Sequence, residues 1–144
     1  MMNPADIEER VQRAQTLFRM GYNCSQAVFA ACADLYGITD KETAFRLSAS
    51  FGGGIGRMHK TCGACCGMFM LEGLNSGSAL PGDTNGKAHN YNRVQMLANE
   101  FRNKYGSITC ARLLGLKDGS KAIRKEPCVD MVGEAVRIFL KHKN

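Results

Sequence analysis

Residues 21–37 read GYNCSQAVFAACADLYG, and this stretch decides the fold class. Asn23 is a residue type that caps the first turn of a helix, and Gly37 is the type that most often ends one. The residues between them show no alternation with a period of two, so they predict a helix over 25–36 rather than a strand. The apolar run AVFAACA (27–33) is far too short to span a bilayer. The stretch therefore predicts a buried helix of a globular protein.

The rest of the chain repeats this alternation of apolar helical segments with residues that cap or end helices. No segment shows a sustained period of two, and the turn-forming stretch NSGSALPGDTNG (75–86) predicts the longest loop. The segments predicted to be helical are 6–20, 25–36, 41–51, 62–73, 87–105, 108–114 and 127–141. At 144 residues the chain suits one domain. We expect an all-α fold, a compact bundle of six or seven helices forming a single domain over residues 1–144.

Composition limits the classes of function. The N-terminal segment MMNPADIEER lacks the basic-then-apolar pattern of a signal peptide, so we expect a cytoplasmic protein with reduced thiols and no membrane insertion. The net charge is +6, and residues 101–144 carry ten basic and four acidic side chains. No aromatic residue interleaves the basic stretch KDGSKAIRKEP (117–127), so solvated helix faces are favoured over nucleic-acid binding.

Four of the seven cysteines fall at predicted helix starts. Cys24 follows the cap Asn23, and Cys62 follows Thr61. Cys110 lies three residues after Ser107, and Cys128 opens the last helix. Free backbone N–H groups and the helix dipole favour a thiolate at such positions. Because the thiolate is the form that attacks disulfides and binds metals, we expect a function for these four. For Cys32, inside the apolar FAACADL, we expect a buried packing role.

Three cysteines crowd the stretch TCGACCG (61–67). Cys62, Cys65 and Cys66 share one helical face. The pair Cys62 and Cys65 has the thioredoxin-type spacing, but that motif accompanies strands, which this chain does not predict. Cys66 occupies the position where covalent haem attachment needs a histidine, so we expect no covalent haem. Only one closely spaced pair exists, whereas a zinc ribbon needs two.

The stretch FGGGIGRMHK (51–60) precedes these cysteines and matches no phosphate-binding pattern. Its glycines permit a close approach of the backbone to a ligand or a helix, or simply form a flexible helix end. His59 suits a base or a ligand, or a solvated loop position. The sequence leaves these alternatives open.

The chain resembles the redox-active family whose pattern is written C-GCAxxG-C-C. The motif Cys-Gly-Ala-x-x-Gly is present as CGACCG (62–67), preceded by FGGGIGRM (51–58). The segments GYNCSQAV (21–28) and SITCARLLG (107–115), together with Cys128, supply the other three signature cysteines. Cys32, Cys65 and Cys66 are additional. The resemblance implies a redox-active or metal-handling protein associated with transport, and a kinship with split-Soret cytochromes, which are helical and dimeric.

Three hypotheses remain open at this point. In the first, Cys62 is a nucleophile of low pKa, and Cys24, Cys110 or Cys128 resolves it as a disulfide. In the second, the same four thiolates bind a metal or an iron–sulfur cluster. In the third, the thiols are buried and structural. The sequence does not decide whether the protein is an enzyme, and it identifies neither a redox partner nor a substrate.

The segment 87–105 bears on assembly. Tyr91, Val94, Leu97, Ala98 and Phe101 form one apolar stripe, and Met96 and Tyr105 add apolar surface beside it. A helix that is apolar over more than one stripe buries more than one side. We therefore expect a homodimer, with a central position in a monomeric bundle as the alternative.

Overall fold

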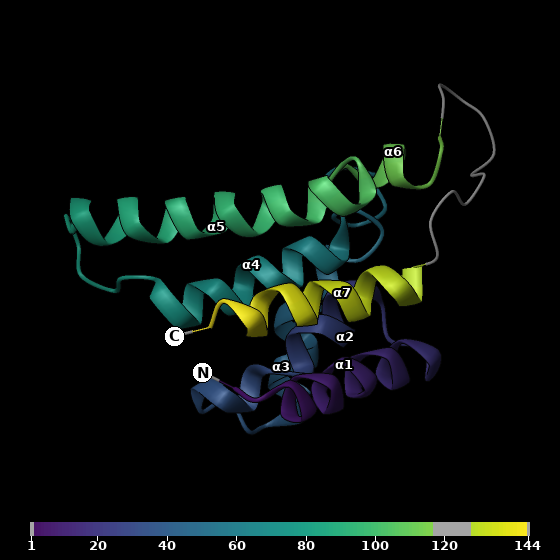
Figure 1. The fold of residues 1–144 in the computed structure, drawn as a ribbon, viewed down its shortest axis with the longest axis horizontal. Helices are drawn as coiled ribbons and strands as arrows, with labels where there is room; N and C mark the ends of the chain where they lie inside the picture. Colours follow the sequence, from purple (N-terminus) through teal and green to yellow (C-terminus); the bar gives the residue numbers. More distant parts are fainter. Residues whose placement is uncertain (1, 117–127, 144) are drawn as a thin grey trace.

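The computed structural model describes residues 2–116 and 128–143, and each regular element in those ranges is helical (Figure 1). The only strand-like feature within them is one isolated bridge between Thr61 and Thr109. The all-α class predicted from the sequence is confirmed. The α-helices of the described ranges are α1 (Pro4–Arg19), α2 (Cys24–Ala30), α3 (Lys41–Ser48), α4 (Gly63–Ser76), α5 (Thr84–Tyr105), α6 (Cys110–Leu113) and α7 (Cys128–Lys141). The 3₁₀ turns η1 (Ala33–Tyr36) and η2 (Ala49–Phe51) follow α2 and α3.

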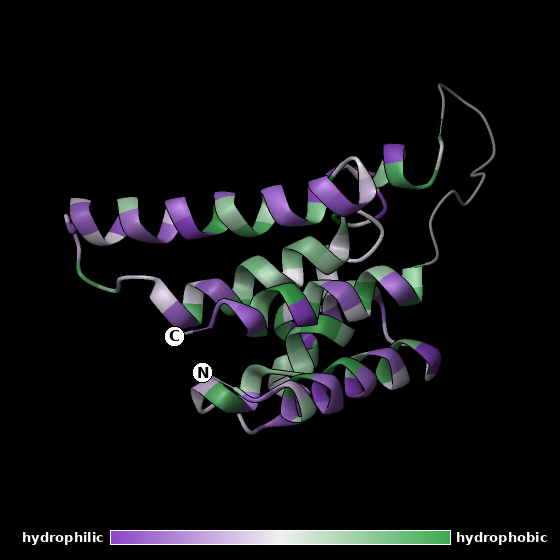
Figure 2. Ribbon diagram, in the orientation of Figure 1, coloured by the Kyte–Doolittle hydropathy of each residue, from purple (hydrophilic) through white to green (hydrophobic). Residues whose placement is uncertain are grey.

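The short helix α2 is the hub of the bundle. In Figure 1, α5 lies along the upper edge and α1 along the lower edge, with α4 and α7 between them. Helix α2 packs against α1, α3, α4 and α7, and α1 lies along α7. Figure 2 shows the hydrophobic residues concentrated on α2, α4 and the inner face of α7. The largest fully buried side chains are Phe101, Phe139, Met68, Leu71, Leu97 and Leu140.

The single helix predicted over 25–36 is interrupted, because α2 ends at Ala30 and Cys32 leaves the helical conformation with φ −131°. Arg10 of α1 stabilises the break. Its guanidinium donates to the carbonyl oxygen of Ala31 at 3.0 Å and pairs with Asp34 at 2.6 Å. A tertiary contact thus replaces the helical hydrogen bonds that the sequence pattern implied.

Other boundaries differ by a few residues. Helix α4 extends to Ser76, and α5 begins at Thr84 with Asp83 as its cap, so the predicted loop over 75–86 shortens to 77–83. Asp40 is the N-cap of α3, which begins at Lys41 as predicted. The predicted start of the last helix at Pro127 lies outside the described residues, and α7 is described from Cys128.

A buried carboxylate joins α4 to α5. Glu72 is fully buried and accepts hydrogen bonds from Arg93 Nε at 2.9 Å and Ser76 Oγ at 2.5 Å. The Arg93 guanidinium also donates to the carbonyl oxygen of His142, which follows α7. A buried charge needs such partners, so this pair fixes α5 and the end of α7 against α4.

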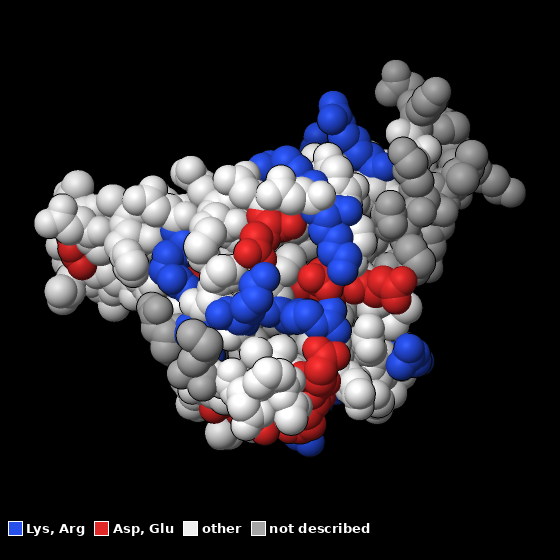
Figure 3. Space-filling model, in the orientation of Figure 1, with Lys and Arg blue, Asp and Glu red and all other residues white. Residues whose placement is uncertain are grey.

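Charges of both signs share the face shown in Figure 3, where basic and acidic side chains lie beside one another. Arg137 of α7 pairs with Glu8 of α1 at 2.8 Å and with Glu134, and Lys104 of α5 also pairs with Glu134. The basic stretch 117–127, for which solvated helix faces were expected, lies outside the described residues. No helix within the described ranges is long and apolar enough to cross a membrane.

Candidate functional site

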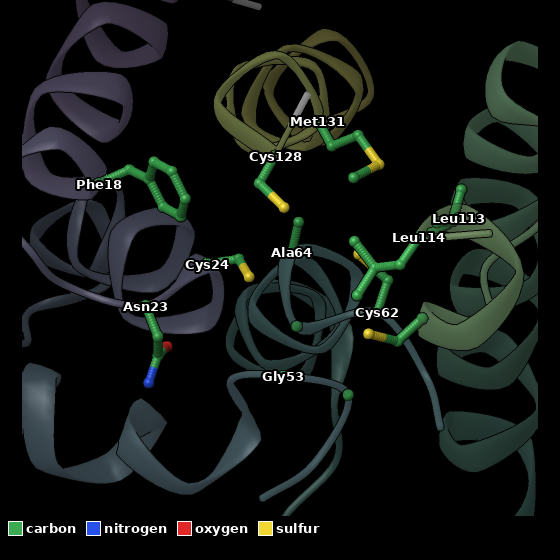
Figure 4. Close-up of a pocket in the computed structure, with 13 residues that line it drawn as sticks. Phe18, Asn23, Cys24, Gly53, Cys62, Ala64, Leu113, Leu114, Cys128 and Met131 are labelled. Atoms are coloured by element: carbon green, nitrogen blue, oxygen red, sulfur yellow. The ribbon is translucent and has the colours of Figure 1, made fainter. Parts of the chain in front are cut away.

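Four helix starts meet around one cavity of about 200 Å³. Its lining includes Cys24, Cys62, Cys110 and Cys128, the four cysteines that the sequence places at helix starts. Figure 4 shows the side chains of Cys24, Cys62 and Cys128 directed into this space from three different helix starts. Cys32, Cys65 and Cys66 do not line it. The structure therefore brings the four candidate residues together and separates them from the additional three; their chemical role stays a prediction.

The local sequence places each of these cysteines at its helix start. Asn23 caps α2 through a capping box with Gln26, which makes Cys24 the first helical residue. The sequence suggested Thr61 as the cap, which would make Cys62 the first helical residue. In the structure Cys62 is itself the N-cap, and α4 begins at Gly63. Cys110 is the first residue of α6 and Thr109 its N-cap, which corrects the predicted cap Ser107. The Ser107 hydroxyl instead accepts from the Thr109 N–H at 2.9 Å.

A short backbone pairing sets Cys62 beside Cys110. The Cys62 N–H donates to the Ile108 carbonyl oxygen at 2.7 Å, and the Cys110 N–H donates to the Lys60 carbonyl oxygen at 2.6 Å. These bonds flank the antiparallel Thr61–Thr109 bridge. In such a pairing, Cys62 and Cys110 are diagonal neighbours on the same face, within reach of each other's side chains. Two segments almost fifty residues apart thus hold two thiols side by side.

Cys62 has the electrostatic environment of a thiolate. The Cys65 thiol and the backbone N–H groups of Cys65 and Ala64, in the first turn of α4, stabilise its charged form. Their effect outweighs the opposing effect of burial and lowers the pKa of Cys62 to about 7. Cys62 is therefore substantially ionised near neutral pH, although only 5% of its surface is exposed.

The neighbouring thiols stay protonated. Burial, reinforced by the sulfurs of Cys62 and Cys128, raises the pKa of Cys24 to about 12. Burial and the same two sulfurs raise the pKa of Cys110 to about 11. The cavity thus combines one thiolate with at least two neighbouring thiols that still carry a proton.

The additional cysteines of the motif lie behind this cavity, in the first turn of α4. Cys65 is fully buried, and burial followed by the hydrogen bond to Cys62 raises its pKa well above the ordinary value. It therefore acts as a permanent S–H donor to Cys62. The Cys66 thiol donates to the Thr61 carbonyl oxygen at 3.7 Å. Cys32 is fully buried in the core, and burial raises its pKa to about 12, in line with the expected packing role.

The glycine-rich stretch forms one wall of the cavity, and its conformation is unusual. Residues 53–57 all have positive φ, including the non-glycine residues Ile55 and Arg57. Such a left-handed run is unfavourable for L-residues with side chains. Hydrogen bonds offset the cost: the His59 and Lys60 N–H groups donate to the carbonyl oxygens of Gly53 and Gly54 at 3.1 and 2.9 Å. The stretch therefore forms a hydrogen-bonded wall, as expected if its glycines permit a close approach of the backbone.

This wall contributes directly to the site. The Gly53 N–H donates to the Cys24 sulfur and partly counteracts the rise in its pKa. The motif glycine Gly63 lets α4 approach α2 closely, since a Cβ on it would lie 3.3 Å from the Cys24 sulfur and 2.9 Å from the Phe51 carbonyl oxygen. His59 does not line the cavity.

Apolar residues that the sequence did not single out complete the lining. They are Phe18 of α1, Ala64 of α4, Leu113 of α6, Leu114 after it and Met131 of α7. Their only sequence signal is proximity to the four cysteines: Met131 follows Cys128 by three residues, as Leu113 follows Cys110. Phe18 lies six residues before Cys24, at the end of a different helix, and carries no such signal.

The geometry of the four cysteines supports metal binding less well than it supports thiol chemistry. Across residues 2–116 and 128–143, no three Cys, His, Asp or Glu side chains lie in an arrangement that could hold a metal ion. The four cysteines share the cavity, but as described they line its walls rather than converge on one point.

Comparison with known proteins accords with this site. Residues 22–142 match the family described as "Putative redox-active protein (C_GCAxxG_C_C)". The chain belongs to this family. The matched region includes all four signature cysteines and every cavity-lining residue except Phe18, so a general redox role follows from membership. No curated protein and no solved structure matches the chain, and the kinship with split-Soret cytochromes that the resemblance implied is untested.

Replacing Cys65 with alanine is expected to raise the pKa of Cys62 from about 7 toward its ordinary value of 9.0, because the S–H donor has the largest part in lowering it. Replacement with serine keeps a donor and is expected to leave the pKa well below 9. The ultraviolet absorbance of the thiolate, followed during a pH titration, measures both variants. An unchanged pKa in the alanine variant would show that the backbone N–H groups suffice.

Proposed function

We propose that the protein performs thiol–disulfide redox chemistry, with the Cys62 thiolate as the nucleophile. The observation that carries the proposal is the contrast inside one cavity: the pKa of Cys62 is lowered to about 7, whereas those of Cys24 and Cys110 are raised to about 12 and 11. A thiolate attacks a disulfide, and a nearby thiol then resolves the mixed disulfide. The backbone pairing favours Cys110 as the resolving residue, with Cys24 next and Cys128 across the cavity.

The exchange is a balanced two-electron step. The Cys62 sulfur forms a bond to one sulfur of a substrate disulfide, and the other substrate sulfur leaves as a thiolate that takes a proton. Cys110, having lost its proton, attacks the Cys62 sulfur and releases the second substrate thiol. The protein gains one disulfide and the substrate is reduced to two thiols. A reducing compartment such as the cytoplasm would return the pair to thiols.

A disulfide-mapping experiment tests this proposal. The reduced protein receives one equivalent of a small disulfide, is quenched in acid and is digested for mass spectrometry. We expect an intramolecular disulfide that includes Cys62. Cys110→Ser is expected to accumulate the mixed disulfide at Cys62, and Cys62→Ser to abolish oxidation. Cys32→Ser, a change outside the cavity, is the matched control and should behave as the wild type. Oxidation that proceeds without Cys62 would overturn the proposal.

A metal or iron–sulfur module on the same four cysteines is the second candidate, favoured only by their shared cavity. Metal analysis of anaerobically purified protein distinguishes the two. Stoichiometric metal, together with thiols that do not react until a chelator is added, would favour the module. Metal-free protein with a reactive Cys62 would favour the redox proposal.

The predicted homodimer also stays a proposal, and its basis is narrower than the sequence implied. Leu97, Ala98 and Phe101 of α5 are buried within the chain itself. What remains exposed lies toward the other end of the helix, where Tyr91 is 59% exposed and Leu74 of α4 is 40% exposed. These two side chains, with Leu80, are the apolar surface on which a second subunit would pack.

Light scattering coupled to size-exclusion chromatography tests the dimer under reducing conditions. We expect twice the chain mass of 15.7 kDa at micromolar concentration, and dissociation on Tyr91→Asp. Arg46→Asp changes an exposed side chain on α3 and is the control for added negative charge. A wild-type mass near 15.7 kDa, or a dimer that disappears only with reductant, would contradict the packing argument.

A further inference from the structure

Among the described residues, the cavity lining has no acidic, basic or histidine side chain, and the one charge it holds is the Cys62 thiolate. The one amide side chain, Asn23, is already occupied: its Oδ1 accepts from the Gln26 N–H at 2.9 Å and its Nδ2 donates to the Ala49 carbonyl oxygen at 3.0 Å. A molecule inside the cavity therefore meets sulfur, hydrocarbon and a few backbone groups.

Apolar side chains cover the approach to the nucleophile. Leu113 and Met131 are 2% and 3% exposed, and Cys62 itself is 5% exposed. A substrate that reacts with Cys62 must therefore enter the cavity. A charged group that enters loses its hydration. An anion meets no cationic side chain among the described lining residues, and a cation meets only the Cys62 thiolate, whose charge is lost as it bonds to the substrate sulfur. The lining therefore disfavours charge of either sign.

The volume of the cavity limits the size of the substrate. A dry cavity of about 150 Å³ accommodates a molecule such as benzene. The cavity here, at about 200 Å³, has room for a molecule of that size or slightly larger. A substrate the size of a tripeptide disulfide does not fit within it.

We propose that this cavity is a binding site for a small uncharged disulfide, which Cys62 reduces. The inference rests on the proposed thiol–disulfide function and specifies its substrate class. The Cys62 sulfur bonds to one substrate sulfur as the substrate S–S bond breaks, and the departing thiolate takes the Cys110 proton. Cys110 then bonds to Cys62, and the second substrate thiolate leaves and is protonated by water. Two substrate thiols and one protein disulfide result.

Three model disulfides of similar size and different charge test the selection. They are bis(2-hydroxyethyl) disulfide, which is uncharged, cystamine, which is a dication, and dithiodiglycolate, which is a dianion. The rate of each with reduced protein at pH 7 is divided by its rate with N-acetylcysteine amide, which corrects for intrinsic reactivity. We expect the uncharged compound to exceed both charged ones by more than about tenfold in this corrected rate. In urea, where the cavity is lost, the preference should vanish.

The net charge of the protein makes this test stringent. At +6, the long-range field favours the dianion, so a preference for the uncharged compound over the dianion must come from the cavity. Equal corrected rates, or a preference for the dianion, would overturn the inference while leaving the redox function intact. Failure of all three compounds to oxidise Cys62 would overturn both.

A charge placed inside the lining should invert the selectivity. Leu114, a half-buried lining residue next to α6, is changed to lysine. Leu114→Lys is expected to raise the corrected rate of the dianion about tenfold relative to cystamine. Leu47→Lys adds the same charge at a side chain that is 52% exposed and outside the cavity, and should leave the selectivity unchanged. Equal effects of the two variants would show that net charge, not the lining, controls access. Circular dichroism verifies that both variants are folded.

Discussion

Brief alkylation of the native protein at pH 7 is expected to modify Cys62 about 10² to 10³ times faster than Cys32. The pKa values are about 7 and about 12, so Cys62 is half ionised while Cys32 is almost entirely protonated. The difference of about five in pKa gives about 10⁵ in thiolate fraction. The lower intrinsic nucleophilicity of the more acidic thiolate removes roughly half of that factor on a logarithmic scale.

Exposure alone would rank the thiols differently, which makes the experiment decisive. Cys66 and Cys110 are each 8% exposed, slightly more than Cys62 at 5%, yet burial raises the pKa of both to about 11. Iodoacetamide labelling followed by peptide mass spectrometry measures all sites in one sample. The Cys62 rate should fall tenfold per pH unit below its midpoint near pH 7 and level off above pH 8. A midpoint near 9, or faster labelling of Cys66, would show that the hydrogen bonds to Cys62 do not stabilise its thiolate.

Local sequence signals were sufficient to predict most of the helices and to select the four cysteines that line the cavity. Asn23 and Gly37 are local signals with local causes, and Asn23 does cap α2. The placement of Cys24, Cys62 and Cys110 at helix starts likewise depends on residues within a few positions of each. Such signals predict where a helix begins, but they do not predict which helix starts meet.

The features that were missed depend on contacts distant in sequence. The break after Ala30 is stabilised by Arg10, which belongs to the preceding helix. Cys62 and Cys110 become neighbours through a two-residue bridge that has no strand pattern in either segment. The buried Glu72 stands in an apolar helix and finds Arg93 twenty-one residues later. In each case a long-range partner determines a local conformation, and single-sequence periodicity contains no information about that partner.

The wall formed by residues 53–57, with its positive φ angles, shows most clearly that local sequence does not predict a conformation set by distant contacts. Three glycines in a row indicate backbone freedom, which is compatible with a disordered end as well as with an ordered turn. The structure shows Ile55, Arg57 and His59 at φ of 58° to 66°. Such a conformation persists only where surrounding contacts over-determine it. Here the Cys110 and Ala111 N–H groups donate to the carbonyl oxygens of Lys60 and His59, so α6 and this wall order each other.

Gly54→Ala is therefore expected to destabilise the protein by about 2–4 kcal/mol. The φ of +71° at Gly54 disfavours alanine by about 1 kcal/mol. The new Cβ would also lie 2.6 Å from Cys110 Cβ and 2.7 Å from Lys60 N, and relieving such overlap costs a further 1–3 kcal/mol, roughly, where backbone must move. Urea unfolding of the reduced protein, followed by circular dichroism, measures the free energy of unfolding.

Gly56→Ala is the matched control, because it measures the cost of a positive φ without the steric overlap. Gly56 lies two residues away with a φ of +58°, but a Cβ there meets only the Ser50 carbonyl oxygen, at 3.9 Å. Its cost should be near 1 kcal/mol, and the reactivity of Cys62 should not change. In Gly54→Ala the displaced Cys110 should also form a disulfide with Cys62 more slowly. Equal losses of stability in the two variants would mean that the wall moves away from α6 without penalty. The left-handed run would then not be what holds Cys110 beside Cys62.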